Sequence, residues 1–167
     1  MERSTRRCCG GLPLAACRPH PPIGAAGGGP AHAASHSKTV PLAIEAGQTS
    51  ENDDLNFNGH SHGEATITVP VGVVVHVDFA NDDPAVAHSL GPDRRVDDFP
   101  RVIARTQPVF PGAITTNPTS LEYGTRPGHA ETLTFTADRP GRSSLICYMP
   151  GHTAAGKWIR FDVALLK

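Results

Sequence analysis

The sequence lacks three features that would place it in other classes of protein. It has no run of about 18 apolar residues, which excludes a conventional transmembrane helix. Its 15 Lys and Arg residues are balanced by 16 Asp and Glu residues, so it lacks the basic excess of nucleic-acid-binding proteins. No segment shows sustained helical periodicity. What is present is a chain of 167 residues rich in Gly and Pro, at 17 and 16, as expected for short strands joined by turns.

Cysteine is scarce outside the N-terminus. Three of the four cysteines, Cys8, Cys9 and Cys17, lie in the first 17 residues, and only Cys147 lies in the strand-rich part. A single cysteine in that part argues against a disulfide framework. We therefore expect the Cys147 thiol to be free for chemistry.

The N-terminal residues resemble an export signal. Basic residues open the chain, and Leu14-Ala15-Ala16-Cys17 resembles a bacterial lipobox, in which the cysteine is lipidated after cleavage. Pro, Gly, Ala and His dominate residues 18–38, a composition that predicts a flexible tether. We expect residues 1–38 to be an export or lipoprotein-like signal and tether, with the protein in the periplasm or on the outer face of the cytoplasmic membrane, anchored through a lipid at Cys17. A disordered N-terminus or a misplaced start is the alternative.

Residues 39–167 form the predicted folded domain. Apolar residues alternate along Val73–Phe79, with the odd-numbered positions on one face, which is the period of a half-buried strand. The other predicted strands are Thr39–Glu45, Glu64–Pro70, Ala87–Leu90, Thr132–Thr136, Ser143–Tyr148 and Lys157–Leu165. About seven or eight short strands at turn spacing predict an all-β sandwich or Greek-key barrel.

The segment from Cys147 to Trp158 predicts a metal site. Cys147 and His152 lie five residues apart around a Pro-Gly turn, so one loop can offer a thiolate and an imidazole to one ion. These ligand types favour copper or zinc over magnesium or calcium. A second imidazole must come from elsewhere, and His88, which follows a predicted strand and an Asn-Asp-Asp-Pro turn, is the best candidate.

The chain resembles the cupredoxins, and among them the sulfocyanin and rusticyanin-like group. Asn56-Phe57-Asn58-Gly59 is similar to the sulfocyanin NFNG segment, and residues 65–90 are similar to that family's two strands and histidine loop. Residues 147–158 follow the family pattern C-x-x-P-G-H-x-x-x-G-M except at its last position. The resemblance covers roughly residues 40–167 and implies a Greek-key β-sandwich that holds copper, as Cu(I) or Cu(II), in one mononuclear site.

The resemblance also implies the copper ligands. His88, Cys147 and His152 match the three equatorial ligands, and Lys157 occupies the position of the axial Met. Met149 is a second candidate for the axial position, although we expect it to pack in a docking patch.

Lys157 has the same parity as Ile159, Phe161 and Val163, so its side chain is expected to start toward the interior. A buried ammonium beside copper is electrostatically unfavourable. Three outcomes follow: the lysine extends its charge to water and leaves a three-coordinate site, it loses its proton and binds copper, or the site binds copper poorly.

Electron transfer is the function that this resemblance implies. We expect an extracytoplasmic type 1 (blue) copper protein, monomeric and not an enzyme, that carries single electrons between redox partners such as a cytochrome or terminal oxidase. The alternative is a copper-binding or copper-delivery module, or a degenerate cupredoxin with a structural or interaction role, and Lys157 favours it.

Gly59-His60-Ser61-His62-Gly63 matches the G-x-S-x-G pattern of hydrolases. The strand-turn-helix context that a nucleophile elbow needs is not predicted here. A polar turn is expected instead, with an accessory metal site at His60 and His62 as the alternative.

Overall fold

The computed structural model describes residues 38–165, and these contain seven strands and no helix. Within this range, therefore, no helix is long and apolar enough to cross a membrane. The strands are β1 (Thr39–Ala46), β2 (Thr66–Pro70), β3 (Val74–Asn81), β4 (Gly91–Asp93), β5 (Ala130–Thr136), β6 (Gly141–Ile146) and β7 (Trp158–Ala164).

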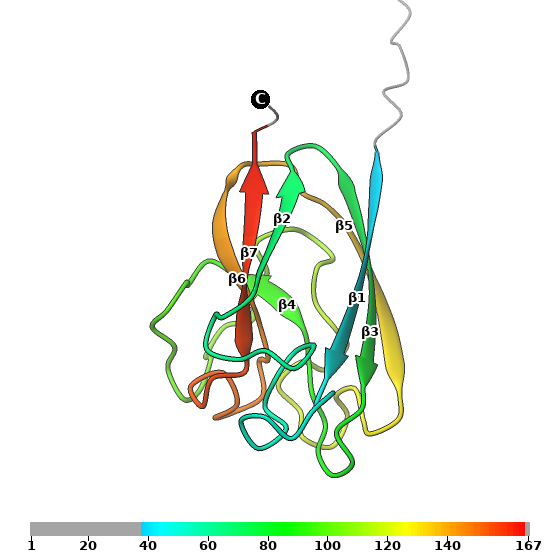
Figure 1. The fold of residues 1–167 in the computed structure, drawn as a ribbon, viewed down its shortest axis with the longest axis vertical. Coiled ribbons are helices and arrows are strands. Elements are labelled where there is room, and N and C mark those ends of the chain that lie inside the picture. The colour runs from blue at the N-terminus through cyan, green and yellow to red at the C-terminus, as the bar shows by residue number, and fades with distance from the viewer. Residues whose placement is uncertain (1–37, 166–167) are drawn as a thin grey trace, which may run out of the picture. The chain divides into compact units, whose positions relative to one another are not determined.

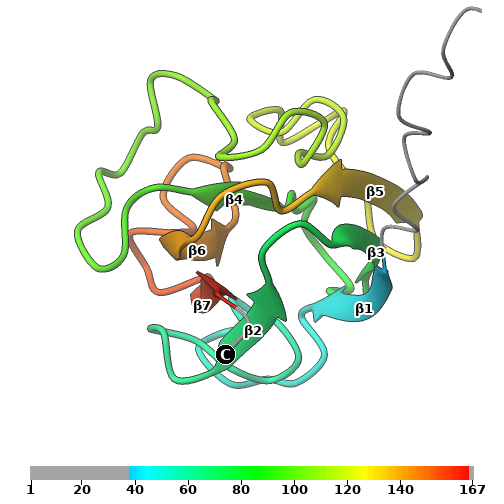
Figure 2. The same ribbon diagram turned by 90° about the horizontal axis from the view of Figure 1, so that it is seen from above.

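The strands form two sheets that face each other. One sheet has the order β1-β3-β5 and the other has the order β2-β7-β6-β4. Strand β1 runs parallel to β3, and β2 runs parallel to β7, whereas the remaining neighbours are antiparallel. Figure 2 shows the two sheets as separate layers. The predicted all-β sandwich is confirmed.

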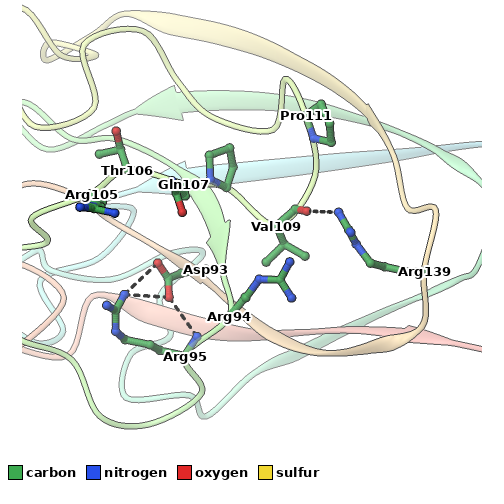
Figure 3. A pocket seen from close by; sticks show the side chains of 10 residues that line it. Asp93, Arg94, Arg95, Arg105, Thr106, Gln107, Val109, Pro111 and Arg139 are labelled. Carbon is green, nitrogen blue, oxygen red and sulfur yellow. Dashed lines mark hydrogen bonds and ion pairs between the residues drawn. The ribbon is translucent and has the colours of Figure 1, made fainter.

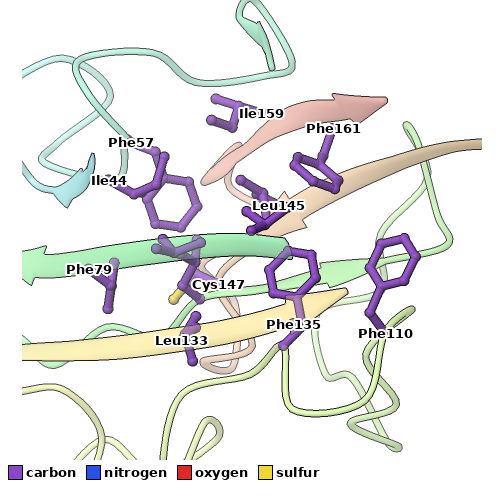
Figure 4. Packing of buried hydrophobic residues seen from close by; sticks show 14 of the residues in the cluster. Ile44, Phe57, Phe79, Phe110, Leu133, Phe135, Leu145, Cys147, Ile159 and Phe161 are labelled. Atoms are coloured by element: carbon purple, nitrogen blue, oxygen red, sulfur yellow. The ribbon is translucent and has the colours of Figure 1, made fainter. Parts of the chain in front are cut away.

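The inner faces of the two sheets supply the core. Val75, Val77 and Phe79 on β3 are at most 1% exposed, as their alternation predicts. The rings of Phe110 and Phe135 stack with their centroids 5.4 Å apart. Figure 4 shows the side chains of this cluster between the sheets. Burial of such aromatic rings, together with the aliphatic side chains around them, stabilises the sandwich.

The fold brings two distant loops to one end of the sandwich. Strand β3 ends there and leads into the loop of His88, and strand β6 ends there immediately before Cys147 (Figure 1). The predicted ligands therefore lie where the ends of strands from both sheets meet.

One predicted strand is wrong. Ala87–Leu90 is not a strand, and the short strand in this region is β4, which begins at Gly91. The reason is that His88 forms only an isolated bridge with Thr125, so its neighbours have no continuous partner strand. Residues 1–37 lie outside the described residues, so the export signal, the tether and the start of the folded domain at residue 39 stay predictions.

Candidate metal centre

Three side chains converge at the end of the sandwich where β3 and β6 terminate. The Nδ1 atoms of His88 and His152 are 3.2 Å apart. The Cys147 Sγ lies 3.8 Å from the first of these nitrogens and 3.5 Å from the second. Cys147 and His88 are fully buried, and His152 is half-buried. Among the described residues, these three form the only cluster of His, Cys and acidic side chains with metal-binding spacing.

The size of this cluster fits a single metal ion. A triangle with these three sides has its centre about 2.0 Å from each atom, close to a metal–imidazole bond of about 2.0 Å and a metal–thiolate bond of about 2.3 Å. Two imidazoles and a thiolate around one point are the donor set of a blue-copper site. The structure thus brings together all three residues that the sequence predicts as equatorial ligands.

A buried carboxylate orients the first imidazole. The His88 Nε2 donates a hydrogen bond to Asp83 Oδ2 at 2.8 Å, which leaves Nδ1 free to bind a metal. The other carboxylate oxygen of Asp83 accepts the backbone N–H groups of Ala85 and Val86 at 2.7 and 3.0 Å. Burial raises the pKa of Asp83, but the hydrogen bonds from Ala85, His88 and Val86 outweigh it and hold the pKa below its usual value.

Asp83 was not predicted from the sequence. It belongs to the turn Asn81-Asp82-Asp83-Pro84, five residues before His88. A carboxylate close in sequence to a predicted histidine ligand is the signal that could have found it. Asn81 fixes the same turn, because its side-chain amide donates to the carbonyls of Val86 and Thr125 at 2.9 and 2.8 Å.

The electrostatic environment keeps both imidazoles neutral. Burial, and then the positive charge of Lys157, lower the pKa of His88 to about 4. The same two causes lower the pKa of His152. Burial raises the pKa of the Cys147 thiol, and the charge of Lys157 opposes this effect. Neutral imidazoles and a thiolate are the forms that bind metal, so the cation favours the required state of all three side chains.

Internal hydrogen bonds close the loop that carries Cys147 and His152. The backbone N–H of Cys147 donates to the Lys157 carbonyl at 3.3 Å, and the N–H of Lys157 donates to the His152 carbonyl at 3.0 Å. The Thr153 hydroxyl also donates to the Cys147 carbonyl. Only glycine fits at position 156, where φ is +101° and a Cβ would lie 2.2 Å from the ring of His62. These bonds hold the loop through backbone groups and the Thr153 hydroxyl, without using any of the predicted metal-ligand atoms.

Lys157 points inward, as predicted, but it does not reach water. It is 0% exposed, so the predicted extension of its charge to solvent is wrong. Its ammonium donates to the carbonyls of Asp54 and Asn56 at 3.1 and 3.0 Å and lies 5.1 Å from the centre of the Phe57 ring. Two carbonyls and an aromatic face compensate a buried cation. Burial lowers the pKa of Lys157 to about 8, which leaves the ammonium form in the majority at pH 7.

The segment that receives Lys157 is residues 47–63, which we call the lysine-binding segment. Asn52, Asp53 and Asp54 have consecutive positive φ angles of 53°, 52° and 63°. This backbone is costly for non-glycine residues and is usually held by its surroundings. Here the Asn52 side chain donates to the carbonyls of Leu55 and Ala155, both at 2.9 Å. The segment is therefore tied to the ligand loop at more than one point.

Further backbone bonds join the same two parts of the chain. The N–H of His62 donates to the Gly156 carbonyl at 2.8 Å, and the N–H of Gly63 donates to the Trp158 carbonyl at 3.0 Å. His60 and His62 are exposed within this turn, and the ring of His62 packs against Gly156. The expected polar turn is confirmed, whereas the accessory metal site stays a prediction.

Met149 lies away from the surface. It is 1% exposed and its methyl group packs against Gly124, so its expected place in an exposed docking patch is wrong. Its role as a second axial candidate stays a prediction. Tyr148 and Trp158 pack with Ile146 in a smaller apolar cluster.

Comparison with a family model identifies the chain. The model of the sulfocyanin (SoxE) domain matches residues 30–165. No curated protein sequence matches the chain.

Two of the similar solved structures, rusticyanin and a multi-copper oxidase, match the fold with TM-scores above 0.5. Rusticyanin from Thiobacillus ferrooxidans is 22% identical, with a TM-score of 0.58 over 77% of this chain and 79% of rusticyanin. A multi-copper oxidase from Pseudomonas thermotolerans is 12% identical, with a TM-score of 0.57 over 78% of this chain but only 31% of the oxidase. Dithionite-reduced auracyanin from the photosynthetic bacterium Roseiflexus castenholzii is 24% identical over 77% of this chain and 99% of its own, with a TM-score of 0.49.

Proposed function

The chain belongs to the sulfocyanin (SoxE) domain family of cupredoxins, and on that premise we propose that it carries single electrons between redox proteins outside the cytoplasm. The family binds one copper ion, and the cluster of His88, Cys147 and His152 suits a type 1 copper site. When bound, copper supplies the one-electron couple between Cu(II) and Cu(I).

The geometry of the three-atom cluster is the observation that carries this proposal. The two nitrogens and the sulfur surround a point at bonding distance from each, and Asp83 holds His88 with Nδ1 toward that point. Cys147 would provide the thiolate, and His88 and His152 would complete the plane. A plane fixed by the fold would change little between oxidation states, which favours rapid electron transfer.

The surroundings of His152 support it as the point of electron exchange. It is the only half-buried member of the cluster, since His88 and Cys147 are both 0% exposed. Val86, in the loop that carries the first imidazole, is 40% exposed, and Val102 is 62% exposed. Val102 follows Arg101, whose carbonyl accepts the Gly151 N–H of the ligand loop at 2.6 Å. Exposed apolar groups beside a metal centre suit a transient protein contact.

We propose a cytochrome, a terminal oxidase or another redox protein as the partner. A monomeric protein in the periplasm, or held at the outer face of the membrane by a lipid on Cys17, would meet such partners. An enzymatic role finds less support, because related cupredoxins such as rusticyanin are electron carriers rather than enzymes.

Copper loading of the purified protein tests the electron-carrier function. The Cu(II)-loaded protein should show an intense thiolate-to-copper absorption in the red part of the visible spectrum and reversible one-electron voltammetry. Cys147→Ser should abolish the absorption, whereas the exposed control Ser50→Ala should keep it. A wild-type protein that stays colourless under full Cu(II) loading would contradict the proposal.

Lys157 favours one second candidate, a copper-delivery module. Its ammonium is bonded to backbone carbonyls of Asp54 and Asn56, so it offers no axial ligand, and a three-ligand site suits Cu(I) and its release. Stoichiometric Cu(I) binding in a chelator competition, without reversible voltammetry, would support delivery. Reversible voltammetry at one potential would exclude it.

A further inference from the structure

A second feature of the molecule, away from the ligand loop, is a groove lined by arginine. The cavity has a volume of about 800 Å³ and lies beside strand β4, the outer strand of its sheet. Arg94, Arg95, Arg105 and Arg139 line it together with one acidic residue, Asp93 (Figure 3). We call it the arginine groove.

The groove carries uncompensated positive charge. Arg95 is paired with Asp93, with both oxygens 3.1 Å from its Nη1, and Arg139 is paired with Asp138 at 3.3 Å. Within residues 38–165, neither Arg94 nor Arg105 has an ion pair. Two of the four arginines are therefore uncompensated, which gives the groove a local positive excess although the whole chain has a net charge of −1. Such a local excess steers anionic partners toward one face.

The wall of the groove is connected to the thiolate through Tyr148. This residue follows Cys147 in the chain, is fully buried, and donates its hydroxyl to the Pro92 carbonyl at 3.3 Å. The same carbonyl accepts the backbone N–H of Val109 at 2.9 Å. Pro92 directly precedes Asp93, and Val109 and Asp93 both line the groove. Covalent bonds and one hydrogen bond thus lead from the Cys147 sulfur to the backbone beside the groove.

We infer that the arginine groove is a second docking surface, which binds an acidic face of a one-electron redox protein, and that Tyr148 couples this partner to the copper ligand Cys147. The inference rests on the proposed electron-transfer function. In the reducing direction the partner loses one electron and Cu(II) becomes Cu(I). No bond is made or broken, no proton moves, and Tyr148 serves only as a bridge.

The arrangement of the arginines favours a protein face over a small anion. They come from three separate segments, at the end of β4, in the loop 105–111 and in the turn after β5, so the charge is spread along the groove. The side chains of Arg95 and Arg139 are 45% and 47% exposed, which places their guanidinium groups at the surface. Guanidinium groups match the geometry of carboxylates, the anionic groups that an acidic protein face presents.

A second docking surface changes what the carrier can do. The first contact area is the half-buried His152 with its exposed apolar neighbours, and the second is basic and polar. Two surfaces of different chemistry would allow an acidic donor and an apolar acceptor face to be recognised separately.

The first test measures binding and needs no copper. The metal-free protein is titrated with poly-L-glutamate while backbone amide NMR signals are followed. Signals of the arginine groove should shift, and Arg94→Glu or Arg105→Glu should weaken binding by about tenfold at low salt. The matched reversal Lys38→Glu, at an exposed residue before β1, should weaken it less than about twofold, because its charge acts only through the long-range field. Equal effects of the three variants, or equally tight binding of inorganic phosphate, would overturn the docking surface.

The second test measures electron flow in the copper-loaded protein. The Cu(I) form is oxidised by anionic hexacyanoferrate(III) and, separately, by the cation tris(1,10-phenanthroline)cobalt(III). The ratio of the two rate constants cancels any change in reduction potential. Arg105→Glu and Tyr148→Phe should each lower this ratio several-fold, and Lys38→Glu should lower it less than Arg105→Glu does.

The two tests separate the two proposals. An unchanged ratio in Tyr148→Phe would overturn the role of Tyr148. A wild-type protein that takes up no copper would contradict the proposed function, and the poly-L-glutamate titration would still decide whether the groove is a docking surface.

Discussion

Asp83 and Lys157 are two buried charges of opposite sign beside the predicted copper ligands, and they are held in mirror-image ways. The anion accepts two backbone N–H groups, those of Ala85 and Val86. The cation donates to two backbone carbonyls, those of Asp54 and Asn56. Each charge is thus compensated by peptide groups of a loop, which limits the cost of burying it.

The difference between them lies in what else each charge contacts. Asp83 also contacts the His88 ring directly, so it fixes the orientation of a ligand. The Lys157 ammonium has hydrogen bonds only to backbone carbonyls, yet its charge lowers the pKa of both imidazoles. Asp83 therefore acts by orienting a ligand, and Lys157 acts through its electric field. Substitutions of Asp83 should change stability and copper affinity, whereas substitutions of Lys157 should change the reduction potential.

Removing the Asp83 carboxylate should have the largest effect on stability and copper binding. Asp83→Ala leaves the His88 Nε2–H and two backbone N–H groups without a partner in a buried site. Each buried donor left unsatisfied costs about 1–3 kcal/mol, so we expect a loss of about 3–5 kcal/mol in the free energy of unfolding of the metal-free protein, measured with urea. Copper affinity, measured by chelator competition, should fall about 10- to 100-fold. The adjacent exposed residue gives a matched control, since Asp82→Ala removes the same charge and should change both values little.

Removing the cation should shift the reduction potential more than the copper affinity. At an effective dielectric constant of about 20, two unit charges roughly 6–8 Å apart interact by about 2–3 kcal/mol. The charge of Lys157 acts on both imidazoles and, being positive, favours Cu(I). Lys157→Leu should therefore lower the potential by on the order of 100 mV in voltammetry. Lys157→Met should lower it further if its sulfur binds copper, so the Leu and Met variants separate charge from ligation. A potential that does not move in Lys157→Leu would contradict action through the field.

Removing hydrogen bonds within the lysine-binding segment should have the smallest effect, a modest loss of stability. Asn52→Ala removes two hydrogen bonds, including the one to Ala155, and places alanine at a positive φ. We expect a loss of about 1–2 kcal/mol in urea unfolding. Asn52→Gly accepts this backbone conformation but loses more conformational entropy on folding, so the difference between the two variants measures the strain minus that entropic cost. If Asn52→Gly is less stable than Asn52→Ala, the strain at position 52 is smaller than the entropic cost of glycine.

Local patterns in the sequence predicted most of the strands, and the family resemblance implied the three ligands that the structure brings together. Alternation along Val73–Phe79 predicts the buried face, because the side-chain period of a strand depends on little else. The same parity argument correctly placed Lys157 inside. The hydrogen-bond partners of its ammonium could not be predicted from the sequence. They lie about 100 residues earlier, on a loop whose shape depends on three positive φ angles.

The misplaced strand has a similar cause. Ala87–Leu90 is apolar enough to be a strand, but whether it pairs depends on which backbone lies beside it in space. There His88 meets Thr125 alone, whereas Gly91 meets Ile146 at the start of a continuous ladder. Pairing between distant segments leaves no trace in the local pattern, so the sequence alone could not distinguish the two positions.

The hydrogen bonds between the lysine-binding segment and the ligand loop bear on whether the chain folds before it binds copper. Because backbone bonds at Gly156 and Trp158, and the ammonium of Lys157, hold the loop without any ion, its ordering entropy is lost when the chain folds. Little of that entropy would remain to be lost when an ion enters. We therefore expect the chain to fold first and to take up copper afterwards, in a separate step.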